Sequence, residues 1–200
     1  MKMENNYWIV DEWLIFKPDF NEELIDYCGV INKYKKIMFS NYDDFLIAIE
    51  TNNQYTDEYC ANFIKNNFNQ EIDLSNNINL IYLTFGFCFV KEIFIPLNVK
   101  SLNMCECNNQ YVIDNLRNNV EELIISNNHL NLDNLPNSIK KLYIEDYEKE
   151  LNNLPNSIEY LELNNYELKI KKIPKNLKTV KCNKEYKYMD DFKNYTVLTY

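Results

Sequence analysis

Apolar residues recur at a nearly fixed spacing through much of the chain. They follow the pattern apolar-x-x-apolar-x-apolar, and successive copies begin at Leu80, Val99, Val120, Ile139, Ile158 and Leu177. The intervals between copies are 19, 21, 19, 19 and 19 residues. Because side chains two residues apart lie on the same face of a strand, each copy predicts one short strand with a buried apolar face.

The segments before the strands define the rest of the repeat. LPNSIKKLYI at 135–144 returns almost unchanged as LPNSIEYLEL at 154–163, and weaker copies carry IPLN or IPKN. The prolines fix φ and remove a backbone donor, and nineteen residues leave no room for a full crossover helix. We therefore expect an extended or 3-10 back side in each coil.

A single coil of this length cannot be stable alone. Ordering it costs roughly 1–2 kcal/mol per residue, whereas about four or five buried aliphatic side chains return only roughly 1.5–3 kcal/mol each. Neighbouring coils must therefore cover each other. The sequence predicts an α/β solenoid with a parallel β-sheet on its concave face and a small mixed α/β cap at the N-terminus.

The ninth position of the first three copies holds Cys88, Cys107 and Asn128. With it, these copies resemble the L-x-x-L-x-L-x-x-N/C pattern of leucine-rich repeats, in which this residue bonds backbone groups of neighbouring coils. On this interpretation the cysteines are ladder positions and not nucleophiles. The later copies depart from the pattern and predict an irregular turn in their half of the array, because the ninth position holds Tyr147, Tyr166 and Glu185.

The proline-containing phrase, together with FNQEI at 68–72, also resembles the FNIP repeats. These form a family similar to leucine-rich repeats that is frequent in amoebae and in the large DNA viruses that infect them. The resemblance implies an interaction scaffold without a chemistry of its own. It divides the chain into an N-terminal α/β cap region at 1–67, six repeats of about 19 residues at 68–185, and a C-terminal cap or degenerate repeat at 186–200.

The N-terminal region does not keep the repeat spacing. DFNEELIDYC at 19–28 predicts a helix capped by Asp19 or Asn21. Three strands are predicted from YWIV, WLIF and KKIMFS, and two more helices from YDDFLIAIE and TDEYCANFIKNNF.

An alternative interpretation of this region is an F-box, which would recruit a ubiquitin ligase through a Skp1-like adaptor. An F-box resembles a three-helix segment that opens with Leu-Pro. The predicted strands and the missing Leu-Pro fit that module poorly.

Composition narrows the range of functions. The formal net charge of −9 argues against nucleic acid as a partner, because phosphate binding depends on clustered Lys and Arg. The start of the chain lacks the apolar core of a signal peptide, and the longest apolar stretch, 80–90, is too short to cross a membrane. Six cysteines without a signal indicate reduced thiols. We therefore expect a cytoplasmic protein, in the host cytoplasm if the chain is viral, without a membrane partner.

No group of residues predicts catalysis, a cofactor or a metal site. His129 is the one histidine and follows two asparagines in an expected turn. Two glycines cannot form a phosphate-binding loop. Cys88, Cys105 and Cys107 lack the paired spacing of a zinc site. We expect a protein that is not an enzyme.

Function is expected on the strand residues that flank the buried ones, because these point outward from the concave face. Tyrosine enrichment there is typical of protein interfaces, although the β-propensity of tyrosine is a competing explanation. We expect a protein partner to bind at Tyr82, Glu122, Ile124, Lys141, Tyr143, Tyr160 and Glu162.

Overall fold

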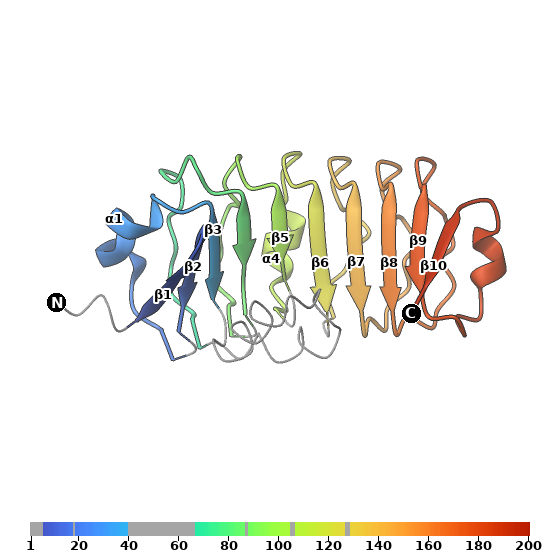
Figure 1. The fold of residues 1–200 in the computed structure, drawn as a ribbon, viewed down its shortest axis with the longest axis horizontal. Helices are drawn as coiled ribbons and strands as arrows, with labels where there is room; N and C mark the ends of the chain where they lie inside the picture. Colours follow the sequence, from blue (N-terminus) through green and yellow to red (C-terminus); the bar gives the residue numbers. More distant parts are fainter. Residues whose placement is uncertain (1–5, 18, 40–66, 87, 105–106, 127–128) are drawn as a thin grey trace.

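The computed structural model describes residues 6–17, 19–39, 67–86, 88–104, 107–126 and 129–200. Ten strands form one sheet in the order of the sequence (Figure 1). β1 (Tyr7–Val10) and β2 (Trp13–Phe16) form an antiparallel hairpin, and every later neighbouring pair is parallel. A solenoid produces this order, because each coil adds its strand beside the previous one.

The parallel strands are short, and six of them occupy the repeat copies. β4 to β9 each begin two residues after the first apolar residue of a copy, as the pattern predicts. The bounds are β3 (Lys36–Phe39), β4 (Tyr82–Thr84), β5 (Ser101–Asn103), β6 (Glu122–Ser126), β7 (Lys141–Glu145), β8 (Tyr160–Asn164), β9 (Thr179–Cys182) and β10 (Thr196–Thr199).

The core is a set of continuous rows that cross the strands. The leucines at the second apolar position pair strand to strand in one row and have no exposed surface: Leu83, Leu102, Leu123, Leu142 and Leu161. The first and third apolar positions form parallel buried rows on either side of it. This alignment confirms the solenoid that the spacing predicts.

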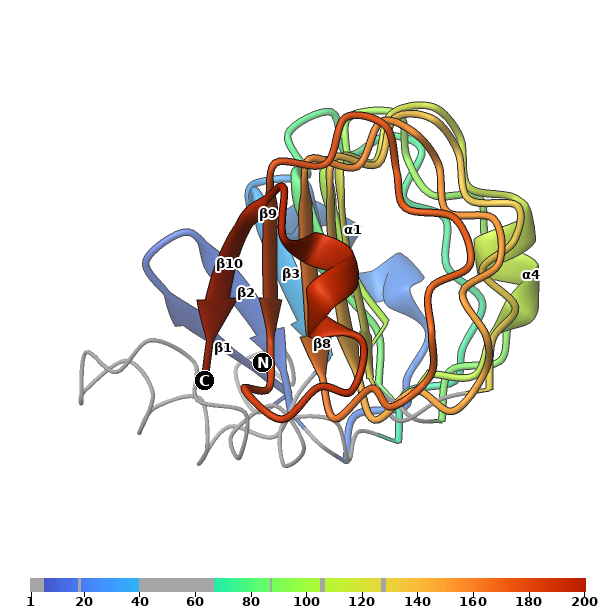
Figure 2. The same ribbon diagram turned by 90° about the vertical axis from the view of Figure 1, so that its right-hand side faces the viewer.

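The back of the array is mostly extended chain and turns, as the prolines predict (Figure 2). The exception is α4 (Gln110–Asp114), a five-residue helix between β5 and β6. It lies in the one interval of 21 residues among intervals of 19. The two additional residues therefore coincide with a local helix on the back face.

A side-chain ladder stabilises the turns that precede the strands. Asn119 Nδ2 donates to the carbonyl oxygens of Pro96 at 3.0 Å and Val99 at 2.9 Å in the preceding coil. Ser157 Oγ donates to the carbonyl of Ile139 at 2.7 Å in the same way. At Asn98, Asn119 and Ser157 the residue before the first apolar position thus bonds carbonyls of the preceding coil.

The turns that follow the strands carry a second ladder. Cys107 Sγ lies 3.3 Å from the carbonyl oxygen of Phe89 in the preceding coil, which places it as a buried ladder residue. In the later copies the tyrosines have the same role: Tyr147 donates its hydroxyl to Leu130 O at 2.8 Å, and Tyr166 accepts from the Leu151 amide at 3.1 Å.

The expected irregular turn in the later copies is therefore wrong for the fourth and fifth. Both turns have the same course, with Asp146 and Asn165 at φ of 46° and 50° immediately before the tyrosines. Asp and Asn tolerate this left-handed conformation better than most residues. In the sixth copy Tyr186, one residue after Glu185, takes the tyrosine position and donates to Leu168 O at 2.6 Å.

The parallel sheet extends into the N-terminal region, where β2 and β3 precede β4 in register. Each of these three coils places two phenylalanine rings face to face: Phe16 with Phe20, Phe39 with Phe68, and Phe85 with Phe89. The first and last pairs are four residues apart in sequence, but Phe39 and Phe68 are 29 apart. The 25 additional residues (29 − 4) hide the repeat from a search for fixed spacing.

The predicted N-terminal helix is shorter than expected and begins later. The 3-10 helix η2 (Leu24–Tyr27) leads into α1 (Cys28–Ile31), without a side-chain cap at Glu23. Asn21 does not cap it, because its Oδ1 accepts the Asn69 amide at 2.9 Å. The two helices predicted within residues 40–66 lie outside the described residues.

The C-terminal end closes with one more strand. The 3-10 helix η3 (Met189–Phe192) follows β9 and lies across the end of the array (Figure 2). It buries Phe192 6.2 Å from the ring of Tyr186. β10 then pairs in parallel with β9.

Candidate interaction surface

The predicted site residues fall into two columns that cross the sheet. One column pairs Tyr82, Ser101, Glu122, Lys141, Tyr160 and Thr179. The other pairs Thr84, Asn103, Ile124, Tyr143, Glu162 and Lys181. Their side chains alternate with the buried rows along each strand, so they share the outer face of the sheet.

The N-terminal part of this face differs from the rest. Ile15, Met38 and Thr84 occupy the second column on β2, β3 and β4, and all three are buried. Tyr82 is half-buried with its ring 4.8 Å from that of Trp13. Tyr82 is therefore separated from the other predicted residues, which lie on β6, β7 and β8.

Glu162 is the centre of a hydrogen-bond network on β8, β9 and the end of β10. Its carboxylate accepts the hydroxyl of Tyr160 at 2.6 Å, the hydroxyl of Tyr200 at 2.5 Å and the Lys181 ammonium at 3.1 Å. Lys181 Nζ also lies 4.1 Å from the centre of the Tyr200 ring. The Glu162 side chain is only 14% exposed, so it organises its neighbours more than it faces solvent.

Tyr143 lies beside this network but is not hydrogen-bonded to it. Its ring centroid is 5.4 Å from that of Tyr160. Burial, with the nearby carboxylates of Glu122 and Glu162, raises the pKa of Tyr143 to about 12. Within the described part of the chain its hydroxyl has no hydrogen-bond partner. Tyr143 is therefore a neutral donor that is available to a bound molecule.

The remaining predicted residues surround Tyr143. Glu122 pairs with Lys141 at 3.3 Å and accepts from Ser101 Oγ at 3.4 Å. Ile124 is half-buried in the column next to Tyr143. Five of the other predicted residues thus adjoin Tyr143 or its direct neighbours on three adjacent strands.

Sequence reasoning did not assign Tyr200 to the surface. It follows β10, which has no copy of the repeat phrase, so its position could not be read from the spacing. Lys181 stood in the correct column but was not singled out. Both side chains complete the Glu162 network.

The described residues offer little for chemistry. They contain no group of three or more His, Cys, Asp or Glu placed to hold a metal ion. Burial raises the pKa of the Cys107 thiol to about 12, the opposite of what a nucleophilic thiolate needs. In the same part of the chain, no helix is long and apolar enough to cross a bilayer.

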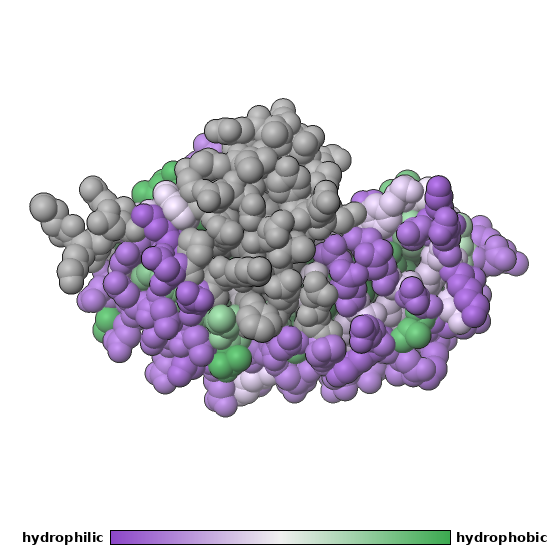
Figure 3. All heavy atoms as spheres, turned by 90° about the horizontal axis from the view of Figure 1, so that it is seen from below, coloured by the Kyte–Doolittle hydropathy of each residue, from purple (hydrophilic) through white to green (hydrophobic). Residues whose placement is uncertain are grey.

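The described residues that are visible at the edge formed by the C-terminal ends of the strands are mostly polar. Viewed from below, the residues coloured in Figure 3 are mainly hydrophilic, with isolated hydrophobic ones between them. Interfaces concentrate aromatic residues at a desolvated centre, and this edge shows no such centre among those residues. The outer face of the sheet around Tyr143 is the better candidate.

Comparisons with known proteins gave a family match and a structural match. Residues 127–166, which contain β7 and β8, match the FNIP Repeat family. A crystal structure described as CroV588, a novel circular LRR protein, is 22% identical over 89% of this chain and 31% of that chain, with a TM-score of 0.46. This chain therefore spans about a third of that protein's length.

A search among curated proteins gave no match. The FNIP segment coincides with the two nearly identical phrases, and the coils on both sides of it share their register. The buried row that holds the leucines runs through all of them, with Val180 at this position on β9. The chain thus contains FNIP-type repeats at residues 127–166, within a longer array of coils that share their register.

Proposed function

We propose that this protein is a non-catalytic binding module that holds a partner protein on the outer face of its sheet, from β5 to β10. Tyr143 carries this proposal. Its hydroxyl is unpaired within the described residues, while the hydroxyl of its neighbour Tyr160 is already bonded to Glu162. A ring on a strand with a free donor is the kind of group that protein interfaces use as an anchor.

The surroundings of Tyr143 are ordered before a partner arrives. Glu162 holds Tyr160, Lys181 and Tyr200 by hydrogen bonds. Association loses affinity when it must immobilise flexible side chains, and prior ordering reduces that loss. The rigid backbone of three adjacent parallel strands adds to the same effect.

Charge around Tyr143 favours a particular kind of partner. The carboxylates of Glu122 and Glu162 both contribute to its raised pKa, and each of them is paired with a lysine, Lys141 or Lys181. We propose that the partner presents an apolar side chain to the two tyrosine rings and a neutral or basic group beside it. Such a group would accept from Tyr143 or approach the carboxylates without repulsion.

The test is affinity purification of the tagged chain from its native host. Tyr143→Ala and Tyr160→Ala should remove the same protein from the recovered set. Ile25→Ala is the matched control, because Ile25 is an exposed apolar residue away from this face, and it should leave recovery unchanged. If a partner recovered with the wild type is retained by both tyrosine variants, the sheet face does not bind it.

The ubiquitin-ligase adaptor role receives no support from the described N-terminal residues. Among residues 6–39, β1, β2 and β3 belong to the sheet, with only the short helices η2 and α1 between them. A three-helix segment is not formed there. The same purification tests the role, because an adaptor should recover a Skp1-like protein in wild type and in both tyrosine variants.

A further inference from the structure

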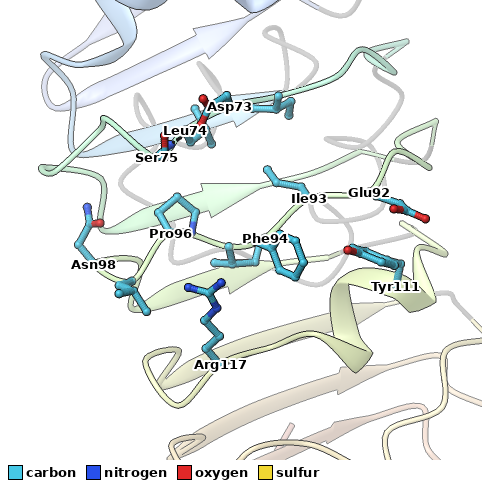
Figure 4. A pocket seen from close by; sticks show the side chains of 13 residues that line it. Asp73, Leu74, Ser75, Glu92, Ile93, Phe94, Pro96, Asn98, Tyr111 and Arg117 are labelled. Carbon is cyan, nitrogen blue, oxygen red and sulfur yellow. Dashed lines mark hydrogen bonds between the residues drawn. The ribbon is translucent and has the colours of Figure 1, made fainter.

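A groove on the back of the array lies away from the sheet face. Its volume is about 670 Å³, and extended segments before β4 and β5 form its floor. Tyr111 from α4 and Arg117, which follows α4, form one side (Figure 4). Figure 2 places α4 on the far side of the solenoid from the strands.

The repeat length explains why the groove occurs at this place. The coil that contains α4 has 21 residues, and the copies that follow it return at intervals of 19. A helix turn is wider than extended chain, so α4 stands out from the back face beside the flatter segment 92–97. The groove is the step between these two coils.

The floor of the groove exposes large apolar side chains. Phe94 is 55% exposed between the buried residues Ile93 and Ile95, and Leu97 is 64% exposed in the turn before β5. The ring of Phe94 lies 5.9 Å from that of Tyr111. Grouped exposed apolar residues next to polar ones are typical of interaction sites.

Arg117 gives the groove a positive charge. It is the one arginine in a chain whose other basic residues are lysines, and its guanidinium carbon lies 5.4 Å from the centre of the Phe94 ring. Among the described residues it forms no ion pair, while nine lysine–carboxylate pairs occur elsewhere. Asp73, across the groove, has its carboxylate engaged by the Ser75 amide at 2.9 Å.

We infer that this groove binds a short extended peptide segment of a partner protein that carries a carboxylate next to an apolar side chain. The guanidinium would bind the carboxylate through two parallel hydrogen bonds, a geometry that lysine cannot provide. The neighbouring apolar side chain would pack on Phe94 and Leu97. Glu92, also on the groove, disfavours a second acidic residue at its end.

The experiment is selection of a random dodecapeptide phage library on the immobilised full chain. The selected peptides should share an acidic residue beside a leucine, isoleucine, phenylalanine or tryptophan. Arg117→Lys keeps the positive charge but removes the guanidinium group that donates two parallel hydrogen bonds. It should therefore weaken binding of a selected synthetic peptide at least about tenfold. Leu97→Ser should weaken it as well, and both residues are exposed enough to leave folding intact.

Other results would overturn the inference. Tyr143→Ala, on the opposite face, should leave peptide binding unchanged, and a loss with this variant would move the site to the sheet. Enrichment of peptides without an acidic residue, equal binding by Arg117→Lys, or no enrichment would each reject it. If Arg117→Lys instead converts an oligomer of wild type to a monomer in light scattering, the occupant is a second copy of the chain.

Discussion

The two halves of the array close their coils by different means. In the N-terminal coils the turn after each strand packs paired phenylalanines, and rings of adjacent coils stack at 5.1 to 6.1 Å. In the C-terminal coils Tyr147, Tyr166 and Tyr186 follow one another at 6.4 Å and bond the backbone of the neighbouring coil. One half relies on buried apolar area, and the other adds hydrogen bonds, within one continuous sheet.

The difference shows what the repeat does and does not constrain. The strand and its buried apolar row continue through both halves, with Ile37 on β3 and Val180 on β9 in place of leucine, because every coil must share that row with its neighbours. The turn after the strand needs only to fill space and satisfy the backbone. Phenylalanine pairs, Cys107 and the tyrosines all meet that need, so this position varies in sequence.

The largest expected effect is in the phenylalanine half. Phe39 faces Phe68 at 4.1 Å and lies between Phe16 and Phe85. Phe39→Ala should lower the free energy of unfolding by about 3–5 kcal/mol, because it removes a ring from a fully packed stack. Urea denaturation followed by circular dichroism measures it. Phe39→Leu, which keeps most of the volume, should cost much less, and equal losses would show that the stack is not closely packed.

A second prediction compares the turns before the strands. Asn119→Ala leaves the buried carbonyls of Pro96 and Val99 without their donor, and we expect a loss of about 2–3 kcal/mol. Ser157→Ala leaves one carbonyl, that of Ile139, and should cost about 1 kcal/mol. Urea midpoints in the same buffer give both values. A larger loss for Ser157→Ala would contradict the proposed ladder.

The tyrosine half is tested by removing one oxygen atom. Tyr166→Phe keeps the ring but leaves the buried Leu151 amide without an acceptor, so we expect about 1–2 kcal/mol of destabilisation. Tyr188→Phe is the control, because the Tyr188 hydroxyl forms no hydrogen bond within the described residues. If the two variants unfold at the same urea concentration, the tyrosines act only through their rings, as the phenylalanines do.

The smallest effect is expected from charges that line the turns before the strands. Lys100, Glu121 and Lys140 each directly precede a strand, and Glu121 forms ion pairs with Lys100 at 3.2 Å and with Lys140 at 2.7 Å. The residue directly before β4 is the uncharged Ile81. Hydrogen bonds from Lys140 and Lys100 lower the pKa of Glu121 from 4.5. Its ionised form therefore stabilises the fold above that pH, and the contribution is lost as pH falls through the lower folded-state value.

The expected readout is a small difference in Tm between wild type and Glu121→Gln. The pairs are solvent-exposed, so the difference should be slight at pH 7 and low salt, and high salt should reduce it. It should decrease as the pH is lowered below 4.5 and the carboxylate is protonated. A difference that grows on acidification would mean that Glu121 is not stabilised as the carboxylate.

The regular part of the fold could be predicted from the sequence because it depends on spacing alone. The start of each strand from β4 to β9, the leucine row and both outward columns follow from the positions of two or three apolar residues. β2 and β3 were expected as strands. Their membership of the same parallel sheet was not expected, because the interval between Phe39 and Phe68 is 29 residues and not four.

The sites were less predictable than the strands. Tyr143, Tyr160 and Glu162 could be placed on one face, but the unpaired hydroxyl of Tyr143 depends on which neighbour Glu162 binds, and no spacing encodes that choice. Tyr200 enters through β10, outside the repeat phrase. The back groove depends on the protrusion of α4 and on the packing of Arg117 against Phe94. Neither feature corresponds to a recognisable sequence motif.

The near-identity of the segments 135–144 and 154–163 has a consequence for the history of the molecule. Both occupy the same geometry, and strand β7 pairs residue for residue with β8. An in-frame duplication or deletion of one nineteen-residue unit would therefore lengthen or shorten the protein by one strand width, about 4.8 Å, and leave both ends intact. Evolution can therefore change the length of the array by whole nineteen-residue units. The surface available to other molecules increases or decreases in proportion.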